Sequence, residues 1–129
     1  MIVGIGTDII DNRRIKKVLD RFGEKFKKRC FSKKEIQKSE NRFQEVNSFA
    51  KRYSAKEACA KALGTGLARG VFWKDIEVKN NKFGKPYIVL HKKALNRLNI
   101  LSKSKCTIQV SLSDEVNYSI ANVIISNDE

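Results

Sequence analysis

Two acidic residues far apart in the chain, Asp8 and Glu57, are of a type that could act together as metal ligands. Carboxylate oxygens are the hard ligands that Mg²⁺ prefers, and protein-bound Mg²⁺ commonly also holds a substrate phosphate. Lys61 lies four residues after Glu57, so its ammonium group could neutralise remaining phosphate charge. Each residue also has a structural interpretation, because Asp8 could cap a turn and Glu57 could form a surface ion pair with Lys61.

A short turn with two glycines, Gly64-Thr65-Gly66, follows this lysine. Because glycine has no Cβ, the backbone N–H groups of such a turn can approach an oxyanion closely. The turn does not match the phosphate-binding loop, which needs the pattern GxxxxGKS or GxxxxGKT. It could equally be the end of a helix, and the sequence leaves both interpretations open.

The spacing of apolar residues predicts the elements that position these groups in the first half of the chain. Residues 2–6, IVGIG, are typical of a buried strand, and Asp8 follows this strand after Thr7. A helix is predicted from Asp11 or Asn12 to Phe22, and Gly23 is expected to end it. Four apolar residues recur at i, i+3, i+4 and i+7 and are expected to face inward: Ile15, Val18, Leu19 and Phe22.

Two more helices are predicted before the glycine turn. The capping-box pattern Ser32-Lys33-Lys34-Glu35 indicates the start of a short helix. A longer helix is predicted from Asn47 or Ser48 to Leu63, with Glu57 and Lys61 on one side. Another side of this helix carries small apolar residues that permit close packing, namely Ala55, Ala58, Cys59 and Ala62.

The second half of the chain favours strands. Ile76–Lys79 and Pro86–Leu90 are predicted as the arms of a hairpin, and a helix is predicted over residues 91–101. Alternating residues predict two further strands, Cys106–Ser113 and Tyr118–Ser126. The order of elements lacks repeated βαβ units, so we predict an α+β fold in which a mainly antiparallel sheet packs against helices. At 129 residues the chain is predicted to form a single domain over residues 1–129.

The charge of the chain points to an anionic partner. The formal net charge is +13, and eleven basic residues between Arg13 and Lys34 face only Asp20 and Glu24. Such a field attracts nucleic acid, an anionic membrane surface, an acidic protein or a phosphorylated small molecule. A nucleic-acid-binding module is the main alternative to an enzyme, but the sequence lacks an aromatic RNA-binding strand and a GXXG loop. Acidic residues on the wet face of the first helix argue against a membrane-surface helix.

Other features of the sequence favour a cytoplasmic location. No apolar run approaches the roughly 20 residues that cross a bilayer, and the N-terminus lacks the layout of a signal peptide. The three cysteines have no CxxC spacing, which favours free thiols in a reducing compartment.

The stretch from Ser48 to Gly66, SFAKRYSAKEACAKALGTG, resembles the signature of the holo-[acyl-carrier-protein] synthase family, the small type of 4′-phosphopantetheinyl transferase. The resemblance extends over nearly the whole chain. It includes, in the expected order, Gly4-Ile5-Gly6-Thr7-Asp8-Ile9-Ile10 with Arg14, Phe31-Ser32 with Glu35, Gly84-Lys85-Pro86, and Ser111-Leu112-Ser113-Asp114 with Tyr118 and Ala121.

This resemblance implies an activity. Enzymes of this family transfer the 4′-phosphopantetheine arm of coenzyme A to a serine of apo-acyl carrier protein, for fatty acid biosynthesis, and release adenosine 3′,5′-bisphosphate. They require Mg²⁺ and form homotrimers with active sites at the subunit interfaces. The expected partners are therefore coenzyme A, an acidic acyl carrier protein and two further copies of the chain.

The resemblance also implies roles for individual residues. Asp8 and Glu57 are expected to hold Mg²⁺, and Lys61 to contact phosphate or assist proton transfer. We further hypothesise that Glu57 accepts the proton of the attacking serine. Asp114 stands where many members have histidine and others aspartate, which alters the contact that a neighbouring subunit is expected to make with coenzyme A. The expected coenzyme A residues are Arg52, Lys61, Gly64, Thr65, Gly66, Lys85 and Pro86, and the expected carrier-docking residues are Arg13, Arg14, Arg21 and Lys25.

Overall fold

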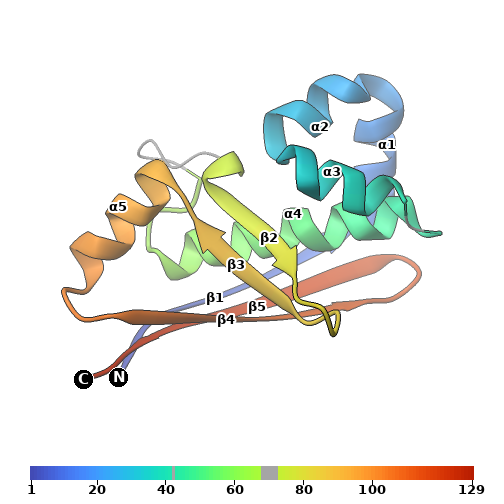
Figure 1. Ribbon diagram of the computed structural model, residues 1–129. Coiled ribbons are helices and arrows are strands. Elements are labelled where there is room, and N and C mark those ends of the chain that lie inside the picture. The colour runs from blue at the N-terminus through green and yellow to red at the C-terminus, as the bar shows by residue number, and fades with distance from the viewer. Residues whose placement is uncertain (42, 68–72) are drawn as a thin grey trace.

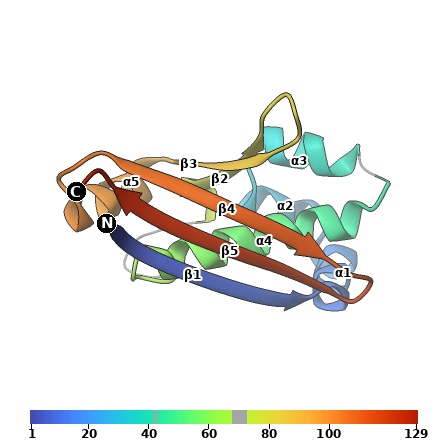
Figure 2. The ribbon, with the colours of Figure 1, turned by 90° about the horizontal axis from the view of Figure 1, so that it is seen from below.

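The structure is a computed structural model, and it describes residues 1–41, 43–67 and 73–129 (Figure 1). One long helix, α4 (Glu45–Ala62), lies along one face of a three-stranded antiparallel sheet (Figure 2). The sheet has the order β1-β5-β4, formed by β1 (Ile2–Asp11), β5 (Tyr118–Asn127) and β4 (Cys106–Asp114). This arrangement confirms the predicted α+β class.

Shorter elements surround the two ends of α4. A hairpin of β2 (Ile76–Asn80) and β3 (Pro86–Leu90) lies beside β4, and α5 (Lys92–Leu101) connects the hairpin to β4 (Figure 2). Three short helices gather near the start of α4 (Figure 1). They are α1 (Asn12–Phe22), α2 (Glu24–Cys30) and α3 (Lys33–Glu40).

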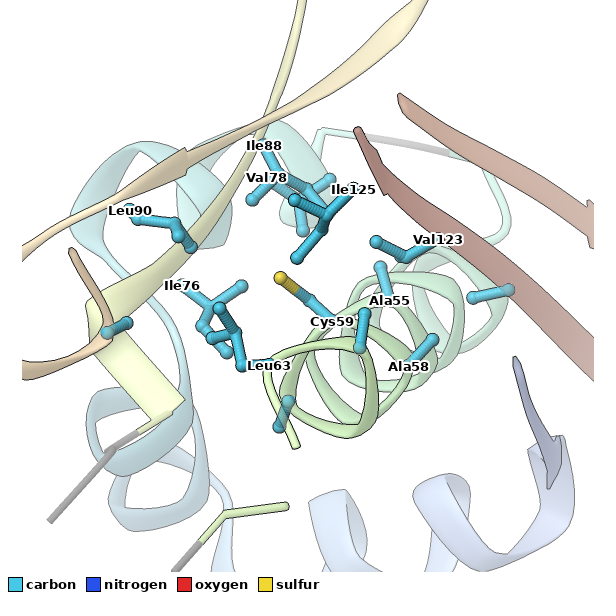
Figure 3. Packing of buried hydrophobic residues seen from close by; sticks show 14 residues of the cluster. Ala55, Ala58, Cys59, Leu63, Ile76, Val78, Ile88, Leu90, Val123 and Ile125 are labelled. Carbon is cyan, nitrogen blue, oxygen red and sulfur yellow. The ribbon is translucent and has the colours of Figure 1, made fainter. Parts of the chain in front are cut away.

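The main core forms around the small face of α4. Ala55, Ala58 and Cys59 are fully buried, as the sequence predicts. Apolar residues from β5 and the hairpin close around them, and Figure 3 shows Cys59 directed into the middle of this cluster, toward Ile76 and Ile125. Packing on several sides therefore fixes the position of α4 in the molecule.

Glycines bring β1 unusually close to α4. A Cβ on Gly6 would lie 1.8 Å from the carbonyl oxygen of Ala58, and a Cβ on Gly4 would lie 2.0 Å from that of Ala62. Two residues of a strand span about 6.8 Å and four residues of a helix about 6 Å. The two periods nearly match, so the next pair in the series is Asp8 of β1 and Ser54 of α4.

The first strand is longer than the predicted range of residues 2–6. It continues to Asp11 because β5 pairs with it along its length, with Asp8 opposite Ala121 and Asp11 opposite Tyr118. Asp8 therefore lies within the strand and not after its end. The long helix also begins at Glu45, slightly before the predicted Asn47 or Ser48.

The basic segment contains one helix more than predicted. Asp11 caps α1 by accepting from the backbone N–H of Arg13, and Gly23, with a φ of 50°, turns the chain directly into α2. Because the chain turns there, Phe22 is 49% exposed and not inward as predicted. The capping box of Ser32 and Glu35 at the start of α3 is confirmed.

The outward face of the sheet carries exposed apolar side chains. Ile5 and Ile9 of β1 are 66% and 61% exposed, and Ile120 and Ile124 of β5 are 36% and 37% exposed. No described element covers this face (Figure 2). Among the helices that the structure describes, none is both long and apolar enough to span a membrane.

Candidate active site

Asp8 and Lys61 meet where β1 runs along α4. The Lys61 ammonium lies 3.3 Å from Asp8 Oδ1 and donates to the Thr7 carbonyl oxygen at 2.9 Å. Ser54 lies two turns before Lys61 on α4. Its hydroxyl contacts both the carbonyl oxygen and Oδ2 of Asp8 as a hydrogen-bond donor, each at 3.0 Å. The Asp8 side chain is only 15% exposed, so its two oxygens have different and defined surroundings.

Glu57 completes this group from the middle of α4. The pKa of its carboxyl is raised, first because burial disfavours the charged form and second because the Asp8 charge repels it. The cationic groups of Lys61 and Arg14 partly offset both effects. The charge of Asp8, from a distant segment of the chain, therefore acts on the Glu57 carboxyl.

The side chains at this position fit Mg²⁺ together with a phosphate, because the carboxylates of Asp8 and Glu57 are suitable ligands for the ion and Lys61 is a cation for the phosphate. Burial is the larger cause of the raised pKa of Glu57, and a cation would relieve the second cause, the repulsion by Asp8. Mg²⁺ in proteins usually keeps several waters and takes one or two carboxylates plus substrate phosphates. Within the described part of the chain, no group of three or more His, Cys, Asp or Glu residues could hold a metal ion, so an all-protein metal cage is not available there.

The Gly64-Thr65-Gly66 turn ends α4. The N–H of Gly64 donates to the Lys61 carbonyl oxygen, and the N–H groups of Thr65 and Gly66 donate to that of Ala60. Arg97 of α5 also donates to the Leu63 carbonyl oxygen at 2.9 Å. The structure therefore supports the interpretation of the turn as a helix end, because its N–H groups already have acceptors. A contact between this turn and coenzyme A stays a prediction.

Arg52 lies on the opposite flank of α4. It is 5% exposed and donates to Ser39 Oγ, the Val78 carbonyl oxygen and Asn80 Oδ1, at 3.2, 2.6 and 2.9 Å. Beside it is a cavity of about 530 Å³ between the start of α4, the hairpin and the end of β4. Its lining includes Phe43, Lys51, Arg52, Gly84, Pro86 and Asp114.

Two further expected residues lie at or near this cavity. Asp114 accepts from Asn47 Nδ2 at 3.0 Å and pairs with the Lys51 ammonium at 3.3 Å. Lys85 does not line the cavity but a neighbouring groove between β3 and β4, which shares Pro86. The negative charge of Asp114 is thus paired with a lysine of the same chain.

The helix itself separates the expected site residues into two groups. At 100° per residue, Glu57 lies about 140° around the helix from Arg52, and Lys61 lies about 180° from it. One chain therefore brings Asp8, Glu57 and Lys61 together. It does not bring Arg52 and Pro86 to them.

The expected docking residues of the first two helices are all exposed. Arg13 is engaged locally, because it forms an ion pair of 2.7 Å with Asp11 and lies over the ring of Tyr118. Arg14 lies near enough to lower the pKa of Glu57, so it stands at the border between this basic surface and the carboxylates.

Sequence reasoning missed two features of the site. Ser54 precedes Ala58 and Ala62 at a spacing of four residues, so it is a polar residue on the small apolar face of the helix. That exception in the pattern is the only local sign of its role. Tyr53 stacks on Trp73 with ring centroids 4.4 Å apart, and burial, followed by the Glu57 charge, raises the pKa of its hydroxyl to about 12. No pattern in the sequence joins these two aromatic residues.

Comparison with known proteins identifies the family to which this chain belongs. A family model described as the 4′-phosphopantetheinyl transferase superfamily matches residues 4–121, which include both carboxylates, most of β1 and all of β4. The chain therefore belongs to the 4′-phosphopantetheinyl transferase superfamily.

Individual relatives narrow the class. The holo-[acyl-carrier-protein] synthase of Parvibaculum lavamentivorans is 49% identical over 98% of this chain and 96% of its own. The crystal structure of the Neisseria meningitidis synthase matches with a TM-score of 0.86 and 34% identity, over 98% of this chain and all of that one. The Helicobacter pylori synthase in complex with coenzyme A has a TM-score of 0.82 and 31% identity, over 95% and 99%. Within the superfamily, this chain is an enzyme of the holo-[acyl-carrier-protein] synthase type.

Proposed function

We propose that this enzyme moves the 4′-phosphopantetheine arm of coenzyme A onto a serine of an apo-acyl carrier protein, with Mg²⁺ held by Asp8 and Glu57. The observation that carries the proposal is the contact between Asp8 of β1 and Lys61 of α4, which places the Asp8 carboxylate one helical turn from the partly buried Glu57. We infer that the holo-carrier protein serves fatty acid biosynthesis in the cytoplasm.

Displacement at a diphosphate asks the protein mainly for positioning and charge neutralisation. When bound, Mg²⁺ supplies positive charge against the diphosphate of coenzyme A. Lys61 adds an ammonium group at the same place, where it can contact the phosphate that leaves. We propose that Glu57, which lies beside this position in the middle of α4, takes the serine proton directly or through a water.

We also propose that the enzyme is a homotrimer with active sites between subunits. Support comes from the separation of the two residue groups by α4, because one subunit can offer its carboxylates while its neighbour offers the cavity beside Arg52. The exposed isoleucines of the sheet supply an apolar face for such contacts. Coenzyme A whose nucleotide part lies in that cavity would then contact residues of two subunits in one active site.

The carrier protein is proposed to dock on the basic surface of α1 and α2. Arg13, Arg14, Arg21 and Lys25 are exposed there, and acyl carrier proteins are acidic. Charge complementarity mainly increases the rate of encounter and fixes orientation. Because exposed charges are screened over about 8 Å at physiological ionic strength, docking should weaken with added salt.

Mass spectrometry of an apo-acyl carrier protein incubated with the enzyme and coenzyme A tests the activity. With Mg²⁺ present, the carrier should gain the mass of one phosphopantetheine arm, and a chelator should abolish the gain. A carrier protein that stays unmodified under all conditions, together with Mg²⁺-independent binding of RNA, would instead favour the nucleic-acid-binding alternative.

A further inference from the structure

Ser54 touches the Asp8 carboxylate from inside the protein. Its side chain is fully buried in α4, and its hydroxyl donates to Asp8 Oδ2 and to the Asp8 carbonyl oxygen, each at 3.0 Å. The single hydrogen of this hydroxyl is thus shared between the side chain and the backbone of Asp8.

This contact gives the two carboxylate oxygens of Asp8 different partners. Oδ2 faces the buried hydroxyl, whereas Oδ1 lies 3.3 Å from the half-exposed ammonium group of Lys61. The backbones around Ser54 and Asp8 cannot move closer together, because Gly6 of the same strand already lies against Ala58, one helical turn further along α4. Ser54 is therefore held at a defined distance from the carboxylate.

We propose that Ser54 is a positioning residue that fixes the Asp8 carboxylate so that Oδ1 can bind a divalent cation. The proposal rests on the proposed function, in which Asp8 is a ligand of Mg²⁺. A hydrogen bond to the second oxygen of a ligating carboxylate orients it, and the loss of such a partner typically weakens metal binding about 10- to 100-fold.

The alternative is that Ser54 only satisfies its own buried hydroxyl. Ser119 of β5 offers a matched control, because it is also fully buried and donates one side-chain hydrogen bond, to Asn12 Oδ1 at 2.7 Å, away from the carboxylates. If the role of Ser54 is merely structural, Ser54→Ala and Ser119→Ala should both lower the melting temperature, and neither should change the affinity for the cation.

The test measures Mn²⁺ as a spin probe in place of Mg²⁺. Free Mn²⁺ is followed by electron paramagnetic resonance while it is titrated into the enzyme with coenzyme A, without carrier protein. We expect Ser54→Ala to weaken Mn²⁺ binding at least about tenfold, Ser54→Thr to restore most of it, and Ser119→Ala to bind like wild type. In turnover, Ser54→Ala should raise the KM for Mg²⁺ and leave the KM for the carrier protein unchanged.

Asp8→Asn separates the two levels of the proposal. If Asp8→Asn loses Mn²⁺ binding while Ser54→Ala binds like wild type, the positioning role of Ser54 is wrong and the metal assignment stands. If Asp8→Asn also binds Mn²⁺ like wild type, the metal assignment itself fails, and the role of Ser54 fails with it.

Discussion

Gly6 of β1 lies so close to Ala58 of α4 that a Cβ on the glycine would be 1.8 Å from the alanine carbonyl oxygen. This contact sets the distance between the strand that carries Asp8 and the helix that carries Glu57. The geometry of the candidate active site therefore depends on a residue that has no side chain.

Gly6→Ala should accordingly lower both stability and activity. The methyl group meets helix backbone, which cannot move aside as a flexible side chain could, and overpacking of this kind costs about 1–3 kcal/mol. Urea denaturation measures the loss of unfolding free energy. Gly84→Ala is the control, since its Cβ would meet no atom within 4 Å and only the φ of +85° opposes it. Equal or smaller destabilisation by Gly6→Ala would contradict the close contact.

Glu77 should make stability depend on pH. Burial raises the pKa of this carboxyl, but the hydrogen bonds from Ser32 (2.8 Å) and His91 (3.0 Å) and the charge of Lys79 outweigh burial, so the pKa is lowered. A carboxyl with a lowered folded pKa contributes stability above its unfolded pKa of about 4.3 and loses it as pH falls through the folded value.

Glu77→Gln should therefore be less stable than wild type by about 1.5–3 kcal/mol at pH 6, and the difference should shrink toward pH 3. Thermal or urea unfolding across this range measures it. The exposed Glu115 gives the control substitution Glu115→Gln, for which we expect little difference at any pH. A difference for Glu77→Gln that stays constant down to pH 3 would refute the lowered pKa.

The outward face of the sheet should hold the proposed trimer together. Ile5→Asp places a charge on this apolar face, and light scattering coupled to size exclusion should then report monomers. Activity should fall with the loss of the trimer, because each site would lack its neighbour. Ile100 on α5 is 68% exposed and lies off the sheet, so Ile100→Asp should leave the mass unchanged. A monomeric wild-type enzyme with full activity would disprove the shared site.

Arg14 should matter more for the carrier protein than for coenzyme A. Arg14→Glu reverses a charge on the basic surface, so we expect the KM for the carrier to rise several-fold more than the KM for coenzyme A, with a smaller difference at high salt. The exposed Lys103, distant from α1 in the sequence, provides the control Lys103→Glu. Equal increases in both KM values for Arg14→Glu would argue against docking on this surface.

Local patterns in the sequence were sufficient for most elements of the fold. The capping box at Ser32, the small face of α4 and the alternation of β4 each depend on neighbours within a few residues. The end of β1 depends on pairing with β5 more than 100 residues later, so the local apolar run was too short a guide. The helix α2 has few apolar residues, and packing of Phe26 against Phe31 and Tyr53 anchors it.

The site was only partly predictable for the same reason. Residue type and motif predict Asp8 and Glu57 as site residues, but their proximity depends on the contact of Gly6 with Ala58. Lys56 shows the limit most clearly, because lysine is rarely buried, yet here it is fully buried against Glu35 and the carbonyl oxygen of Trp73. Its partners lie 21 and 17 residues away, in elements that only the folded chain brings together.

The most direct test of the whole account is single-turnover transfer from coenzyme A to apo-acyl carrier protein, at saturating Mg²⁺, by wild type, Asp8→Asn and Glu57→Gln. If the two carboxylates hold the cation and Glu57 takes the serine proton, both variants should be slower by at least about 10²-fold while they remain folded. Transfer at close to the wild-type rate in both variants would show that the paired acids are not the centre of the reaction.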